Sequence, residues 1–361
     1  MWLEGEREAL EDYGAIERRL AGHRGALEDC GTIELRLEGP WRIVDHREEA
    51  RGAVEDYGTI EPQLEGHPPP LPVLPPPSLR ALALHWLQED TSPFDPASSL
   101  SGAGGLRGPA RAQLVSKSAG VLAGLPFAEA VFRELGCELR ALLPEGSALP
   151  GARTVVAELR GPAWGLLYGE RVALNCLGRC SGVATMATAA RGVARARGWH
   201  GLVAGTRKTT PGFRLAEKYA LAVGGADAHR WGLDGLLLVK DNHVALHGGS
   251  MEELVGAARA AAGFWRRVSI EVGSEGAAVA AAAAGADIVL MDNFSPQALH
   301  KAAAAVKASR PHVVVEASGG ITLDSLPHFL GPHIDVVSMG CLTHSAPALD
   351  FALKVLPHSE Q

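Results

Sequence analysis

The second half of the chain holds a series of short aliphatic runs, and this series constrains the fold most. Helix-like stretches separate most of the runs, and the expected helices are 251–262, 277–284, 296–308 and 323–330. Aliphatic strands that alternate with helices form a parallel sheet that is covered on both faces. The spacing favours a (β/α) barrel, incomplete by the standard of eight strands, over an open doubly wound sheet. Six strands are expected at 202–204, 236–239, 268–270, 288–291, 313–315 and 334–337, and a seventh would lie in 221–225.

The first 67 residues differ in character from the rest. They hold eight arginines, no lysine and 17 acidic residues, and they repeat one acidic pattern at 9–17, 26–34 and 53–61. The repeats are spaced irregularly, whereas a stacked solenoid needs a fixed period. We therefore expect a disordered acidic extension over 1–67, with an interaction arm or a lid as the alternative. The proline-rich run over 68–77 predicts a stiff, extended linker.

The segment after the linker mixes helices and strands. Ser78 is expected to cap a helix, 127–136 to form a second helix, and 155–159 to form a strand. A long alanine-rich helix is expected near 172–197. We place an α/β domain at 78–171 and a barrel domain at 172–340.

Composition and charge exclude several classes of protein. The formal net charge of −7 argues against nucleic-acid binding. No apolar run approaches the roughly 20 residues of a membrane span, and the acidic N-terminus is unlike a secretory signal. Five cysteines without framework spacing indicate a reducing compartment, so we expect a cytoplasmic protein.

Polar residues follow the expected strands, and they are sorted by charge. The early strands are followed by the cations Arg207, Lys208, Arg230 and Lys240. His229 directly precedes Arg230, and Asp241 directly follows Lys240. The middle strands are followed by Glu271 and Asp292, and the fifth by Glu316. The last two strands are followed by Ser318, Gly319, Gly320 and Gly340. In a barrel these positions share the face that carries active sites, so the set predicts one site.

The sorting by charge indicates what the site binds. Backbone N–H groups at Ser318-Gly319-Gly320 and Gly340 are suited to a phosphate, because glycine lets the backbone approach closely. The cations suit a ligand with several negative charges. Two carboxylates without cysteine favour Mg²⁺, which also binds substrate phosphates. Any one of these residues taken alone is explained as a surface charge or a helix cap. The ordered set along consecutive strands indicates a binding site instead.

These motifs resemble those of the quinolinate phosphoribosyltransferase family, the decarboxylating enzymes of NAD biosynthesis. The match lies in 171–182, in 205–219 with its Thr-Arg-Lys-Thr-Thr-Pro-Gly stretch, and in Val-Lys-Asp-Asn-His at 239–243. Met-Asp-Asn-Phe at 291–294 and Glu-Ala-Ser-Gly-Gly-Ile at 316–321 follow in order. The resemblance covers about 78–361, is nearer the animal form than the bacterial ones, and has no counterpart for 1–77.

The resemblance implies an architecture and an assembly. The family combines an N-terminal open-faced α/β sandwich with an incomplete α/β barrel, and the end of the chain, 341–361, would return to the sandwich. It implies a head-to-tail homodimer, or a hexamer built as a trimer of dimers. Arg171 would then be supplied to the site of the neighbouring subunit.

The resemblance also implies the roles of the site residues. Quinolinate would meet Arg171, Arg207, Lys208, His229, Arg230 and Lys240. Phosphoribosyl pyrophosphate would meet Glu271 and Asp292, which would hold Mg²⁺ and the ribose hydroxyls, and its 5-phosphate would meet Ser318, Gly319, Gly320 and Gly340. Lys240, Glu271 and Asp292 would be the catalytic residues. The expected products are nicotinate mononucleotide, pyrophosphate and CO₂.

Two other functions stay open at this point. One is a phosphoribosyltransferase for a mono-carboxylate such as nicotinate, which would not need so many cations. The other is a non-catalytic barrel scaffold whose acidic extension binds a partner, which the complete set of strand-end residues disfavours.

Overall fold

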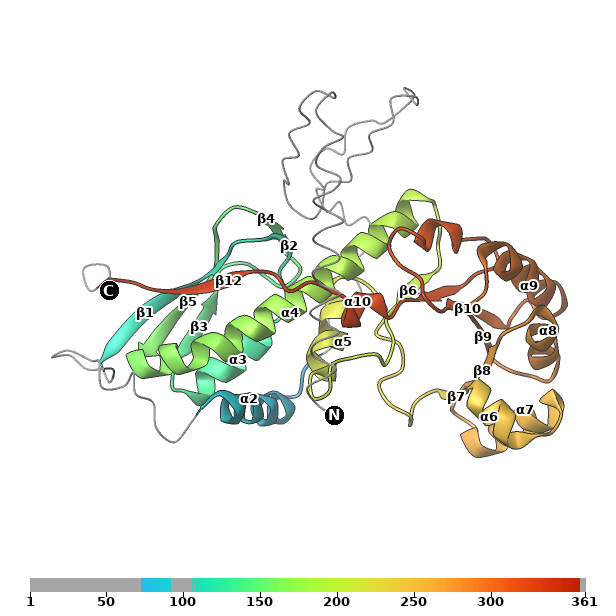
Figure 1. Cartoon of the computed structure of the whole chain (residues 1–361). Coiled ribbons are helices and arrows are strands. Elements are labelled where there is room, and N and C mark those ends of the chain that lie inside the picture. The colour runs from blue at the N-terminus through green and yellow to red at the C-terminus, as the bar shows by residue number, and fades with distance from the viewer. Residues whose placement is uncertain (1–72, 92–105, 107, 358–361) are drawn as a thin grey trace, which may run out of the picture. The chain divides into compact units, whose positions relative to one another are not determined.

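The structure is a computed structural model that describes residues 73–91, 106 and 108–357 (Figure 1). The expected extension at 1–67 and half of the expected linker, 68–72, lie outside these ranges. No helix in the described ranges is long and apolar enough to cross a membrane.

The first part of the described chain forms an antiparallel sheet. Its strand order is β12-β1-β5-β3, with bounds Phe351–Val355, Pro109–Ser116, Thr154–Pro162 and Glu138–Ala141. Two short strands, β2 (Ala119–Val121) and β4 (Ala148–Pro150), pair separately. Leu114 of β1 pairs with Leu353 of β12, so the end of the chain returns to this sheet. The core combines Leu114 and Leu159 with Phe132 of a covering helix.

Three helices pack beside this sheet. They are α2 (Pro76–Asp90), α3 (Leu125–Glu134) and α4 (Ala163–Ala196), with α2 on α3 and α3 on α4. The 34-residue α4 is one unbroken helix (Figure 1). It contacts β1, β5 and β12 of the antiparallel sheet, and also α5 (Arg214–Val223) and β6 (Leu202–Ala204) beyond it. Its alanines and glycines permit these close approaches: a Cβ at Gly182 would lie 1.9 Å from the carbonyl oxygen of Pro347.

The second part forms a parallel sheet of six strands. The order is β6-β11-β10-β9-β8-β7, and the remaining bounds are Val336–Ser338, Val314–Ser318, Ile288–Asp292, Val268–Val272 and Leu237–Val239. All six aliphatic runs expected to be strands are therefore strands. Ile270, Val289 and Val315 are fully buried, as strands covered on both faces should be.

Serines begin the helices between these strands. Ser250 and Glu253 form a capping box for α7 (Met251–Ala262). Ser274 caps α8 (Glu275–Ala283) and Ser295 caps α9 (Pro296–Ser309). The shorter α6 (Asp241–His247) follows β7, and α10 (Cys341–His344) follows β11.

Four sequence predictions are wrong in detail. The run 221–225 is not a strand, because its apolar residues lie on the buried face and at the end of α5; only an isolated bridge between Ala204 and Asp227 follows it. The stretch 323–330 holds a 3₁₀ turn, Leu326–His328, with Pro327 in it. Ser78 does not cap α2, which begins at Pro76 with proline in its first turn. The alanine-rich helix begins at Ala163 instead of 172.

Candidate active site

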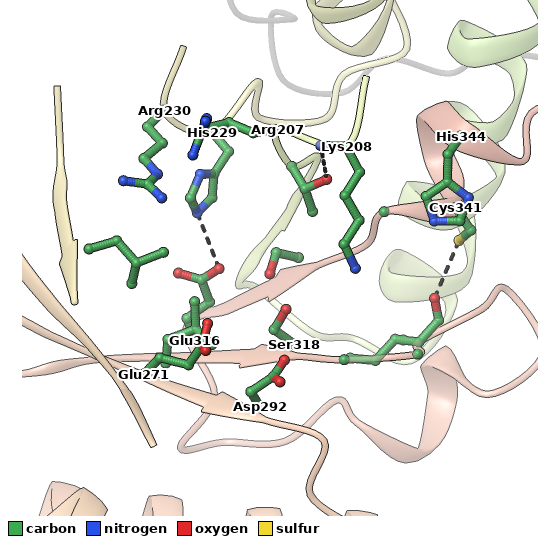
Figure 2. Close-up of a pocket in the computed structure, with 18 of the residues that line it drawn as sticks. Arg207, Lys208, His229, Arg230, Glu271, Asp292, Glu316, Ser318, Cys341 and His344 are labelled. Atoms are coloured by element: carbon green, nitrogen blue, oxygen red, sulfur yellow. Dashed lines mark hydrogen bonds and ion pairs between the residues drawn. The ribbon is translucent and has the colours of Figure 1, made fainter. Parts of the chain in front are cut away.

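A cavity of about 540 Å³ opens at the carboxyl ends of the parallel strands. Figure 2 shows its side chains converging from loops that follow different strands. All the expected site residues except Arg171 line it, namely Arg207, Lys208, His229, Arg230, Lys240, Glu271, Asp292, Ser318, Gly319, Gly320 and Gly340. The parallel sheet thus brings together residues that are more than 130 positions apart in the chain.

Arg171 is not part of this cavity. It lies on α4 and its side chain is exposed. Within one subunit, the structure therefore leaves Arg171 away from the other cations.

Two cations come from the loop after β6. The hydroxyl of Thr206 accepts a hydrogen bond from the backbone N–H of Lys208 at 3.0 Å, which fixes the turn between them. Arg207 is half-buried, and its Nε is buried without a hydrogen-bond partner among the described residues. An unpartnered buried donor costs about 1–3 kcal/mol, so the guanidinium keeps donor capacity for an anionic ligand.

His229 and Arg230 lie on a tightly held turn. His229 has a φ of +57°, which is rare for a residue with a side chain. The Asp227 carboxylate accepts from the backbone N–H of His229 at 2.5 Å, and Lys218 donates to the carbonyl of Ala228. Lys218 is fully buried, and burial lowers its pKa to about 8. The buried Lys218 therefore holds the strained turn through its hydrogen bond to Ala228.

Acidic residues occupy the other side of the cavity. Lys240 forms an ion pair with Glu271, and Figure 2 shows Glu271 near Asp292. Burial and the neighbouring Glu271 raise the pKa of Asp292, while Lys240 and Lys208 act in the opposite direction. A cation close to Asp292 therefore stabilises the ionised form of its carboxylate.

A glycine turn closes the cavity beyond β10. Gly319 and Gly320 have φ values of +95° and +64°. A Cβ at Gly319 would lie 2.5 Å from the backbone nitrogen of Asn293, so the chain can approach this closely only with glycine. This turn exposes backbone groups to the cavity, as phosphate binding requires.

Some lining residues were assigned no role from the sequence. Glu316 lines the cavity and is almost fully buried, with its Oε1 3.2 Å from Nε2 of His229. The signal for Glu316 was its place at the end of an expected strand. Thr322, Ser338 and His344 also line the cavity, and they lie in a turn and in short elements that carry no recognisable motif.

The described residues include no group of three or more histidines, cysteines or acids arranged to hold a metal ion. Glu271 and Asp292 together supply two carboxylates and no sulfur, a donor set for a hard cation. As two oxygen donors they fit Mg²⁺ as part of a ligand set.

Comparisons with known proteins agree with this geometry. The model of the quinolinate phosphoribosyl transferase N-terminal domain matches residues 100–181, and that of its C-terminal domain matches 183–354. The chain is 59% identical over 284 residues to a protein of Homo sapiens and 58% over 283 residues to one of Rattus norvegicus. Both are named nicotinate-nucleotide pyrophosphorylase (carboxylating), and each match covers 78% of this chain and 93% of the relative.

A crystal structure of NadC from Streptococcus pyogenes is also similar. It superposes with a TM-score of 0.71 at 36% identity, and the match covers 79% of this chain and 100% of that one. Sequence and fold therefore agree over the same share of the chain, and the chain belongs to the quinolinate phosphoribosyltransferase family.

Proposed function

We propose that this protein transfers the phosphoribosyl group of phosphoribosyl pyrophosphate to quinolinate with loss of CO₂. The products are nicotinate mononucleotide, pyrophosphate and CO₂. One observation carries the proposal: a single cavity combines several cations, three acids and a glycine turn with positive φ. A dicarboxylate, a leaving pyrophosphate and a 5-phosphate need these three parts.

Quinolinate occupies the side of the cavity lined by cations. Its carboxylates meet Arg207, Lys208, His229, Arg230 and Lys240. The guanidinium groups of Arg207 and Arg230 suit bidentate contacts with carboxylates. Burial and the neighbouring Arg207 lower the pKa of Arg230, so an incoming carboxylate relieves the repulsion between the two guanidinium groups. A mono-carboxylate such as nicotinate would leave part of this cluster unneutralised.

Phosphoribosyl pyrophosphate occupies the other side. The backbone at Ser318, Gly319, Gly320 and Gly340 receives the 5-phosphate. Glu271 and Asp292 face the ribose and its hydroxyls. The two substrates then lie side by side, with the quinolinate nitrogen directed at the ribose C1.

The reaction follows from charge stabilisation. Pyrophosphate leaves C1 with the bonding electron pair, and the carboxylates of Glu271 and Asp292 stabilise the positive ribose ring. The quinolinate nitrogen then donates its lone pair to C1. The bond from the ring carbon C2 to its carboxylate then breaks, CO₂ departs, and the electron pair stays on C2 beside the positive nitrogen until C2 takes up a proton from solvent. This uptake is the one proton transfer in the sequence, so holding two polyanions in position supplies much of the rate.

Mg²⁺ is the proposed metal. When bound, it neutralises charge on the departing pyrophosphate. Glu271 and Asp292 would hold it together with substrate oxygens, directly or through water. The raised pKa of Asp292 supports a site that a cation would stabilise.

We also propose the assembly that the family implies, a homodimer or a trimer of dimers in which Arg171 reaches the partner's cavity. The exposure of Arg171 on α4 supports this role.

We further propose that the six-stranded sheet is an incomplete barrel with β6 and β7 at its two edges. The domains proposed are a sandwich at 78–171 plus 341–361 and a barrel at 172–340. The cytoplasmic location stays a prediction.

The first experiment measures CO₂ release from carboxyl-labelled quinolinate, with phosphoribosyl pyrophosphate and Mg²⁺ supplied or withheld and with a chelator as control. Release that needs all three components supports the proposal. Turnover of nicotinate with no CO₂ release from quinolinate would favour the mono-carboxylate enzyme. A chain without residues 1–72 should keep its turnover, whereas a scaffold that acts through its extension would show no turnover in either form.

A further inference from the structure

A buried threonine hydroxyl joins two walls of the cavity. Thr343 lies in α10 and is fully buried, so it does not line the cavity itself. Its Oγ1 lies 2.6 Å from the carbonyl oxygen of Lys208 and 3.1 Å from that of Gly340. Lys208 belongs to the cation loop after β6, and Gly340 belongs to the turn proposed to hold the 5-phosphate. The Thr343 hydroxyl has one hydrogen to donate, and it lies within hydrogen-bond distance of a carbonyl oxygen from each wall.

The buried Glu217 and the partly buried Arg179 close this contact into a ring. The carboxylate of Glu217 accepts from the backbone N–H of Thr210 at 2.9 Å and from its hydroxyl at 2.8 Å. Arg179 donates to the same carboxylate at 2.9 Å. Arg179 also donates to the carbonyls of Thr343 and Ala346. The ring therefore connects the cation loop, α5, α4 and α10 and returns to Lys208.

The position of this ring lets it fix the distance between the loop after β6 and α10, in addition to filling part of the core. Glu217 is fully buried and Arg179 is largely so, and hydrogen bonds are stronger in such a low dielectric. The walls also touch directly, since a Cβ built on Gly340 would lie 3.0 Å from Cδ of Lys208 and 3.0 Å from Nε2 of His344. A shift of α10 against the loop would therefore move Lys208 relative to the phosphate turn.

We propose that Thr343 is a positioning residue, which holds the Arg207–Lys208 loop at the distance from Gly340 that the reaction needs. The inference rests on the proposed function, because it assigns quinolinate to one wall and the 5-phosphate to the other. A displacement of about 1 Å between two reacting groups can cost on the order of 100-fold in rate. The loss of the hydroxyl should therefore appear in kcat more than in the binding of either substrate alone.

The test compares T343V, which keeps the shape and removes the hydroxyl, with T343S, which keeps the hydroxyl. T185V is the matched control: the Thr185 hydroxyl bonds the backbone of Val121 and Ser181, away from the cavity. For each full-length protein, kcat, both KM values, the dissociation constant of quinolinate alone and the melting temperature are measured. We expect kcat of T343V to fall about 10- to 100-fold, with quinolinate binding changed less than about threefold.

T343S should recover kcat to within about threefold of the wild type, and T185V should lose stability without a comparable loss of kcat. A T343V enzyme as active as T185V would overturn the inference. So would a T343S enzyme as slow as T343V. Crystal structures of the wild type and T343V decide the matter independently of turnover: an unmoved Lys208 in T343V contradicts the inference. Absent CO₂ release by the wild type would instead contradict the proposed function.

Discussion

Nε2 of His229 lies 3.2 Å from Oε1 of Glu316, and the two side chains are 13% and 4% exposed. Glu316 therefore fixes the orientation of an imidazole that sits on a strained backbone turn. E316Q keeps the size of the side chain and removes its charge, which weakens a charge-assisted hydrogen bond worth about 1 kcal/mol more than a neutral one. We expect the KM for quinolinate to rise about three- to tenfold with kcat nearly unchanged, as measured by steady-state kinetics at saturating phosphoribosyl pyrophosphate.

The control for E316Q is D350N, which removes an exposed ion pair between Asp350 and Lys117. Exposed pairs contribute little, so its kinetic constants should stay within about twofold of the wild type. An unchanged KM for quinolinate in E316Q would show that Glu316 does not hold His229 for binding.

Lys240 pairs with Glu271 and is proposed to contact substrate as well. K240A removes this cation and leaves Glu271 without its partner. We expect CO₂ release to fall by more than about 1,000-fold, since a cation that holds and neutralises the quinolinate carboxylates is lost. Circular dichroism should show the wild-type fold because Lys240 is at the surface of the cavity. Wild-type turnover in K240A would contradict the site assignment.

The two glycines of the phosphate turn should differ sharply in their tolerance of alanine. In G319A the new methyl group would meet the backbone of Asn293, whereas nothing lies within 4 Å of the corresponding position at Gly320. G320A suffers only from its positive φ, which costs about 1–2 kcal/mol. We expect the KM for phosphoribosyl pyrophosphate to rise at least about tenfold in G319A and clearly less in G320A. Equal effects of the two substitutions would contradict this prediction.

The carboxyl of Glu145 should make stability depend on pH. Burial raises its pKa from 4.5 to about 7, although the backbone N–H groups of Gly124 and Leu125 donate to it. Between these values the folded state holds the proton more tightly than the unfolded state, so this group's contribution to the free energy of unfolding falls as pH rises.

E145Q has no proton to lose at this position. Its stability relative to the wild type should therefore improve between about pH 4.5 and about pH 7.5, by no more than about 3 kcal/mol. Urea denaturation at both pH values measures this difference. A difference between the two proteins that is the same at both pH values would contradict the raised pKa.

The sequence predicted the parallel sheet well because its strands are buried on both faces. Runs such as Ile288–Met291 have to be aliphatic, because helices cover both faces of these strands. The end of α5 was misread because Leu221 and Val223 are apolar for a different reason: they pack the inner face of a short helix. The start of α4 was missed because glycines at 165 and 169 conceal a helix that packs closely on α3 and on the segment after it.

The site was predictable to the extent that its residues follow strands. Parallel strands end at one edge, so Lys240, Glu271 and Asp292 had to meet there. Arg171 follows no strand, and its place on an exposed helical surface gave no signal of its own. The ring around Thr343 could not be found either, because Arg179 and Thr343 meet across 164 positions of sequence and no pattern in the sequence links them.

The pairing of β1 with β12 has a consequence for the order of folding. β1 lies between β5 and β12, and its second partner comes from Phe351–Val355. During synthesis the early strands leave the ribosome long before that segment, so one edge of β1 has no native partner until every strand of the parallel sheet has been made. Unpaired edges invite association with other chains. Completion of the antiparallel sheet therefore comes after synthesis of the whole parallel sheet, and nascent chains arrested before Phe351 should be the ones that need protection from a chaperone.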